Sequence, residues 1–242
     1  DGVLRTIRDY GSCGGRCLMA WFESLLTGRT GALLLDATLE TLGMVLVSLV
    51  GAEVFGLVLG TGLILWQPGG LKENKPLYAV LSWVVNIGRS IPFVILMVSI
   101  MPFTKLITGT SIGTVAAIVP LTVSAIPFVA RLTETAMHGV EIGVIEACVS
   151  MGASWQQIVR YVLVPESLPA LIAGAANTGI SLIGYSTMAG AIGGGGLGDL
   201  AIRYGYQRWQ PDVMLASVVI LVGMVQGMQF VGDRLAARYR RH

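Results

Sequence analysis

The sequence predicts an all-α integral membrane protein, and two observations support that prediction. Hydrophobic residues make up 54% of the 242-residue chain and charged residues only 12%, about half of the roughly 25% that soluble domains carry. The chain also contains several apolar runs of about 20 residues, the length that an α-helix needs to cross the hydrocarbon core. Helices are expected because lipid cannot satisfy the polar groups at the edge of an open sheet.

Five segments are expected to cross the membrane: Leu42–Trp66, Leu77–Phe103, Ile112–Ala130, Leu168–Ile192 and Val213–Val231. The second contains Pro92, which breaks or kinks a helix. We therefore expect Leu77–Gly88 to lie partly along the surface and the deeper part to begin near Ile91. Residues 104–111 are predicted to form a polar turn, and residues 193–211 a loop.

The two ends of the chain differ in composition. Residues 1–34 are predicted to be an N-terminal extension of uncertain structure, and residues 35–242 the transmembrane domain. Three cysteines, Cys13, Cys17 and Cys148, are too few and too scattered for a disulfide framework. The spacing of Cys13 and Cys17 gives only weak support for a metal or disulfide role.

Charge sets the expected orientation. The net charge of +2 gives no footprint for nucleic acid. With five crossings, one side of the membrane would hold most of the basic residues outside the N-terminal extension: Lys72, Lys75, Arg131, Arg160, Arg234, Arg238, Arg240 and Arg241. Since cytoplasmic segments carry the excess of Lys and Arg, the C-terminus and the segment between the third and fourth crossings are predicted to be cytoplasmic.

That segment contains the stretch EACVSMGASWQQIVRYVLVP, Glu146 to Pro165, which is amphipathic rather than membrane-spanning. Gly143–Met151 is predicted to form a short helix that ends at Gly152, a residue suited to the left-handed conformation. Ser154 and Gln157 form a predicted capping box for a second helix, Trp155–Leu163. Pro165 is expected to stop that helix and to open the next one. From the residues alone, an interfacial helix pair that merely joins two spans remains an open alternative.

The stretch resembles the cytoplasmic coupling motif of ABC-importer permeases, which reads Glu-Ala-Ala, three residues, Gly, nine residues, then Ile, any residue, Leu-Pro. Glu146, Ala147, Gly152 and Pro165 match at the motif spacing, whereas Cys148 replaces the second Ala. Four further segments are similar to the methionine-uptake branch of that family: NIGRSIPFVILMVSIMPFTKLITGTSIG, AAIVPLTVSAIPFVAR, GYSTMAGAIGGGGLG and QFVGDRL. The similarity extends from about Leu35 to the C-terminus.

The resemblance implies a permease subunit of the bacterial inner membrane that acts as a homodimer. It would take methionine or a related amino acid from an extracytoplasmic binding protein. Two partner ATPases at the cytoplasmic face would bind the coupling segment through Glu146, Ala147, Cys148 and Gly152 and drive alternating access. The chain contains no G-x-x-x-x-G-K-[ST] phosphate loop, so it is not expected to be an enzyme. Any ATP and Mg would be held by the partner, and no cofactor or metal is expected in this chain.

Asn177, Ser181, Tyr185 and Met188 recur on one face of the fourth predicted span. We expect this weakly polar face to line the translocation path, with Tyr185 or Met188 in a gate. The alternative is helix packing through small residues such as Gly174, Thr178 and Ser181.

Three other features carry weaker signals. The glycine run Gly190–Gly198 is expected to be a hinge or a close-packing site, because a nucleotide loop would need a preceding strand. Glu53 lies in the middle of a span, where an ionisable group is costly, but we favour a protonated or neighbour-paired side chain. Glu134 and Glu141 are predicted to lie on a solvated cytoplasmic face.

Two rival functions remain: an ABC permease for another small solute, and an ion-coupled secondary transporter. The second would normally show more spans, an inverted repeat and buried carboxylates at broken helices.

Overall fold

The computed structural model describes residues 29–239, and that part of the chain is helical with no strand. Four long helices form its frame: α3 (Arg29–Trp66), α7 (Thr114–His138), α10 (Val164–Ala191) and α12 (Pro211–Tyr239). Shorter helices join them: α4 (Lys75–Ser90), α5 (Phe93–Ser99), α6 (Met101–Thr108), α8 (Ile142–Ser150), α9 (Trp155–Ile158), the π turn η1 (Val159–Leu163), α11 (Gly196–Leu200) and the π turn η2 (Ala201–Gln207).

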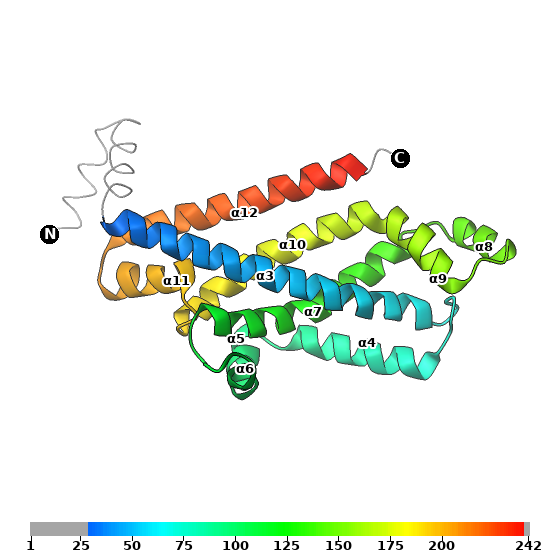
Figure 1. Cartoon of the computed structure of the whole chain (residues 1–242), viewed down its shortest axis with the longest axis horizontal. Helices are drawn as coiled ribbons and strands as arrows, with labels where there is room; N and C mark the ends of the chain where they lie inside the picture. The colour runs from blue at the N-terminus through cyan, green and yellow to red at the C-terminus, as the bar shows by residue number, and fades with distance from the viewer. Residues whose placement is uncertain (1–28, 240–242) are drawn as a thin grey trace.

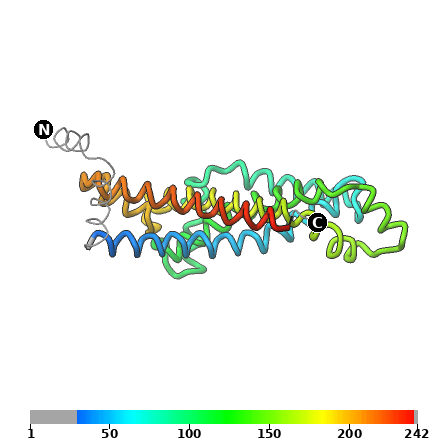
Figure 2. Tube along the Cα trace, turned by 90° about the horizontal axis from the view of Figure 1, so that it is seen from above, coloured from blue at the N-terminus to red at the C-terminus, as the bar shows by residue number. Residues whose placement is uncertain are grey.

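The long helices run side by side along one axis (Figures 1 and 2), with α8 and α9 at one end of the bundle and α11 at the other. Within the described residues, four helices are long and apolar enough to cross a membrane. The number is five if α4 and α5, bent by 103° at their junction, count as one crossing. This agrees with the predicted five crossings and with the predicted break at Pro92.

Close packing between α3 and α7 forms the centre of the bundle. A Cβ atom on Gly56 would lie 2.5 Å from the Val129 side chain, and one on Gly60 would lie 2.5 Å from the carbonyl oxygen of Ala130. Glycine at these positions lets the two backbones approach, as small residues do in membrane proteins. Beside this contact lies the main buried cluster, which includes Leu121 and Leu182.

Large apolar side chains also cover the outside of the bundle. Val58 is 70% exposed, and Trp83 and Val50 are exposed to a similar degree. In water such a surface would be unfavourable, but against lipid tails it costs nothing.

Several predicted boundaries are wrong. The first long helix begins at Arg29 rather than Leu42, so the predicted boundary between residues 34 and 35 falls inside α3. α7 continues to His138 rather than ending at Ala130. The α4 segment does not lie apart along a surface: it runs beside α3 and α7 (Figure 1), and Gly88 packs against Pro127. Cys13 and Cys17 lie outside the described residues.

Two breaks predicted from Gly and Pro are also wrong. Pro165 does not stop its helix, because Trp155–Ala191 forms one continuous 37-residue helix. The helix widens into the π turn η1 just before the proline, where the Val164 N–H donates to the Val159 carbonyl five residues back. Residues 193–211 are not simply a loop, since α11 and η2 occupy most of that range.

Candidate functional site

The predicted coupling segment, residues 143–165, folds as the local sequence signals predict. Gly152 has φ of +79°, the left-handed conformation expected at the bend. The Ser154 N–H donates to Gln157 Oε1 at 2.8 Å, and the Gln157 N–H donates to Ser154 Oγ at 3.4 Å, which completes the predicted capping box. The result is a short helix, a glycine turn and a second helix at one end of the bundle (Figure 1).

The two arms of this segment differ in how they are held. α8 has no buried residue; Glu146 and Ala147 are exposed, and Cys148 is half-buried. The other arm is anchored, because Ile158 and Leu163 are only 1% and 2% exposed and pack with Val140. The structure therefore brings the predicted coupling residues together on an exposed arm whose neighbour is fixed in the bundle.

A groove of about 820 Å³ separates α8 from the loop that joins α3 to α4. Leu71 and Gly70 line it on the loop side, and Ile145 and Glu146 on the α8 side. The Lys72 ammonium lies 5.5 Å from the centre of the Trp155 ring, a cation–π contact between this loop and the first residue of α9. Sequence reasoning missed this contact, since no local pattern pairs residues so far apart in the chain.

Glu73 links two parts of the loop that joins α3 to α4. Its carboxylate accepts a hydrogen bond from the Gly69 N–H at 3.2 Å and lies 3.2 Å from the Lys75 ammonium. The Gly69 N–H, followed by the nearby Lys75, holds the pKa of Glu73 below its usual value. The loop beside the coupling segment is thus ordered by its own polar contacts.

An ion pair lies near the end of α7. Glu134 is 5% exposed, pairs with Arg131 and accepts a hydrogen bond from the Tyr78 hydroxyl at 3.3 Å. The prediction that Glu134 lies on a solvated face is therefore wrong, because α4 covers it and supplies Tyr78 as a partner. Glu141, by contrast, is exposed as predicted.

The candidate pore residues lie along α10 but differ in their surroundings. Asn177 is exposed and Met188 is 46% exposed. Tyr185 stacks on Phe93 of α5, with the ring centroids 4.9 Å apart and the planes 6° from parallel. Gly174 and Thr178 are buried in the bundle, whereas Ser181, which belongs to both the predicted packing face and the predicted pore face, is half-buried. Whether the predicted pore face lines a pore stays a prediction.

The glycine run is a close-packing site between α10, α11 and the start of α3. A Cβ on Gly198 would lie 2.5 Å from the backbone of Thr187. The Gly196 N–H donates to Glu40 Oε2 at 2.9 Å, and the Leu197 N–H donates to Thr41 Oγ1 at 2.8 Å. Within residues 29–239 the run is preceded by a helix and not by the strand that a dinucleotide-binding loop follows.

Near the same end, η2 and the turn that follows expose aromatic side chains. Tyr206 is 69% exposed and Trp209 is 83% exposed. Among the described residues other than glycine, Trp209 alone has positive φ, at 54°. Arg208 packs over the ring of Tyr204 at 4.4 Å. This surface lies at the opposite end of the bundle from α8.

Glu53 lies in the middle of α3 and is half-buried. Its Oε1 has no hydrogen-bond partner in the described part of the chain. That Glu53 is protonated or faces a neighbour stays a prediction. In the same range, no group of His, Cys, Asp and Glu side chains is arranged to hold a metal ion.

Comparison with known proteins identifies the family. Residues 54–241 match the family described as binding-protein-dependent transport system inner membrane component. The probable D-methionine transport system permease protein MetI of Vibrio cholerae is 53% identical over 208 residues, which cover 85% of this chain and 92% of that protein. The methionine import system permease protein MetP of Bacillus subtilis is 48% identical over 171 residues, or 71% of this chain and 77% of that one.

Solved structures agree. One described as an inward-facing conformation of the MetNI methionine ABC transporter has a TM-score of 0.84 and 49% identity, and the match covers 86% of this chain and 96% of that one. An amino acid ABC transporter at 18% identity has a TM-score of 0.66 and supports the fold alone. The chain therefore belongs to the family of binding-protein-dependent transport system inner membrane components, the permease subunits of ABC transporters.

Proposed function

We propose that this chain is the permease subunit of an ATP-driven importer for methionine or a related amino acid. The observation that carries the proposal is the exposed helix–glycine turn–helix segment, with Glu146, Ala147 and Gly152 at the positions of the coupling motif. The relatives named for methionine transport at 48–53% identity support the choice of substrate.

In this proposal a partner ATPase binds α8. The arm is suited to docking because it has no buried residue and only Ile145 and Cys148 pack partly against the bundle, so the rest of its surface is open. Movement of α8 would pass through Gly152 to α9, which continues without a break into α10. Closure of two ATPase subunits around ATP and Mg would thereby shift the helix that carries the candidate pore face, as alternating access requires.

Two copies of the chain would form the path, with the α10 faces toward each other. Asn177 and Ser181 would offer polar contacts, and Met188 an adaptable apolar one that suits a thioether side chain. Tyr185, held by its stack on Phe93, would couple this face to the bent α4–α5 segment. The homodimer is part of the proposal and follows from the resemblance to the family.

The end with α11 and η2 would face the extracytoplasmic binding protein. Exposed Tyr206 and Trp209 support this placement, since Trp and Tyr often anchor protein interfaces. The α8 end and the C-terminus would then face the cytoplasm of a bacterial cell, in agreement with the predicted distribution of Lys and Arg.

Reconstitution in proteoliposomes tests the proposal. The full chain, an ATPase subunit and a binding protein encoded beside it should take up labelled methionine only when ATP is present on the ATPase side. Uptake driven by a proton or sodium gradient without ATP would instead favour a secondary transporter. Competition by unlabelled amino acids and other small solutes separates a methionine importer from an ABC permease for another substrate.

A further inference from the structure

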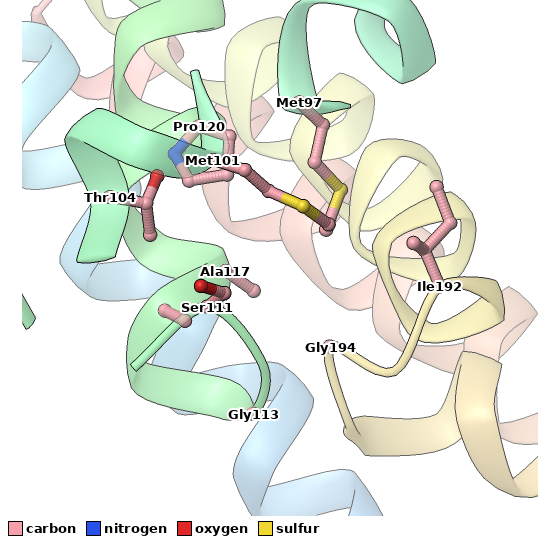
Figure 3. A pocket seen from close by; sticks show the side chains of 10 residues that line it. Met97, Met101, Thr104, Ser111, Gly113, Ala117, Pro120, Ile192 and Gly194 are labelled. Atoms are coloured by element: carbon pink, nitrogen blue, oxygen red, sulfur yellow. The ribbon is translucent and has the colours of Figure 1, made fainter. Parts of the chain in front are cut away.

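A small cavity lies between α6, α7 and the glycine run, away from the coupling segment. Its volume is about 10 Å³. Thr104 of α6 and Ala116 and Pro120 of α7 are among the residues that line it. Figure 3 shows the sulfur ends of Met97 and Met101 meeting beside it and the Thr104 hydroxyl turned toward the Pro120 ring.

Thr104 is polar and almost fully buried. It is 3% exposed, and its Oγ1 has no hydrogen-bond partner among the described residues. Two of the other buried threonines bond to the carbonyl four residues earlier: Thr41 donates to Ala37 and Thr178 to Gly174, at 2.8 and 2.9 Å. A hydroxyl buried without a partner is strongly destabilising, so the position of Thr104 requires an explanation.

Pro120 creates a second polar group that needs a partner. It lies inside α7 and has no N–H to donate to the carbonyl of Ala116 one turn earlier. Ala116 is 3% exposed and lines the same cavity. Ordered water is one of the means by which membrane proteins satisfy carbonyls that a proline frees.

The size of the cavity fits one water molecule. A site of about 10–15 Å³ holds a single water, provided that two or more polar groups face it. The Thr104 hydroxyl is turned toward Pro120, and Ala116, whose carbonyl Pro120 leaves without its helical donor, lines the cavity together with half-buried Ser111.

We propose that this cavity is a binding site for one ordered water molecule that joins α6 to α7 at the Pro120 interruption. The water donates one hydrogen bond to the Ala116 carbonyl and exchanges a second with the Thr104 hydroxyl. It holds α6 against the central helix α7. This site is independent of what the chain transports.

The direction in which one substitution changes the melting temperature, Tm, tests the proposal. In the full chain purified in detergent, Thr104→Val removes the hydroxyl and keeps the shape. A hydrated site predicts that Tm falls by roughly 2–6 °C, whereas Thr104→Ser, which keeps the hydroxyl, loses less. Thr178→Val is the matched control, because its hydroxyl bonds within its own helix, and its Tm should change by less than Thr104→Val. A Tm for Thr104→Val equal to or above that of the wild type would overturn the proposal, since removing an unpaired hydroxyl from a dry cavity stabilises.

A double-mutant cycle tests the bridge itself. Pro120→Ala restores an N–H for the Ala116 carbonyl and so removes one partner of the water. In that background the fall in Tm caused by Thr104→Val should shrink by at least half. An equal fall in both backgrounds would mean that no water links the two groups. If Pro120→Ala does not fold, the comparison of Val with Ser at residue 104 still decides between a hydrated and a dry cavity.

Discussion

The two arms of the coupling segment, α8 and α9, have different environments. α9 continues into η1 and α10, and this helix buries Ile158 and Leu163, whereas α8 has no buried residue and only Ile145 and Cys148 are half-buried. Gly152 separates them. The contrast shows that the two sides of one glycine differ in burial: α9 is packed into the bundle, whereas α8 is open for the partner that the proposed function assigns to it.

The largest expected effect comes from breaking the junction between the arms. Gly152→Asp should reduce ATP-dependent uptake more than tenfold while membrane insertion is retained, because a carboxylate enters the docking surface at a bend whose surroundings are open. Asp tolerates positive φ better than most residues, so the fold should survive. The rate of ATP-dependent uptake of labelled methionine by reconstituted vesicles, compared between Gly152→Asp and the wild type, measures this loss.

Gly109→Asp is the control for that variant. Gly109 has φ of +77° and the same open surroundings, but it ends α6 far from α8 in the chain. Similar uptake by the two variants would argue that the effect is strain and that Gly152 has no role in coupling.

The same substitution in both arms sharpens the comparison. Ile158→Ala should lower the free energy of unfolding by about 2–4 kcal/mol, because it empties a packed site. Ile142→Ala in α8, where the side chain is 71% exposed, should change it by less than about 0.5 kcal/mol. Thermal unfolding in detergent measures both. Equal losses of stability would mean that α8 is packed in solution as tightly as α9.

Removing the Arg131–Glu134 ion pair near the end of α7 should have an intermediate effect on stability. Glu134→Gln removes the charge that pairs with Arg131, and we expect a loss of about 1–3 kcal/mol. Glu141→Gln, at an exposed position, should be almost neutral. If denaturant unfolding gives the two variants the same stability, the contacts of Glu134 with Arg131 and with Tyr78 of α4 do not stabilise the fold.

The smallest expected effect concerns the contact between the α3–α4 loop and α9. A double-mutant cycle with Lys72→Met and Trp155→Leu should yield a coupling energy of about 0.5–1 kcal/mol. Strictly additive losses would show that the loop does not brace the anchored arm.

The successful predictions for the bend at Gly152 rest on short-range hydrogen bonds. Gly152 and the Ser154–Gln157 box involve partners at most three residues apart, so the sequence around them determines the bend. The contacts of Lys72 with Trp155 and of Tyr78 with Glu134 join distant parts of the chain, and no local pattern distinguishes them from solvated side chains.

Helix boundaries failed for a related reason. Pro165 is a strong stop signal in an ordinary α-helix, yet the π turn before it moves the hydrogen bonds by one residue and accommodates the ring. The glycine run predicted a loop, but α11 begins directly after Gly195, whose φ is +76°. Loop propensity is a property of each residue by itself, whereas the contacts of this run with α3 favour the helix at Gly196–Leu200.

The unbroken helix Trp155–Ala191 has a mechanical consequence. At 1.5 Å per residue it is a rod of about 55 Å, so a tilt of about 5° pivoting at its Trp155 end displaces its far end by roughly 5 Å. That exceeds the width of a water molecule. Under the proposed function, a modest rotation imposed from the α8 end would therefore be enough to open or seal an aqueous passage at the other end, without any change in the helix's own hydrogen bonds.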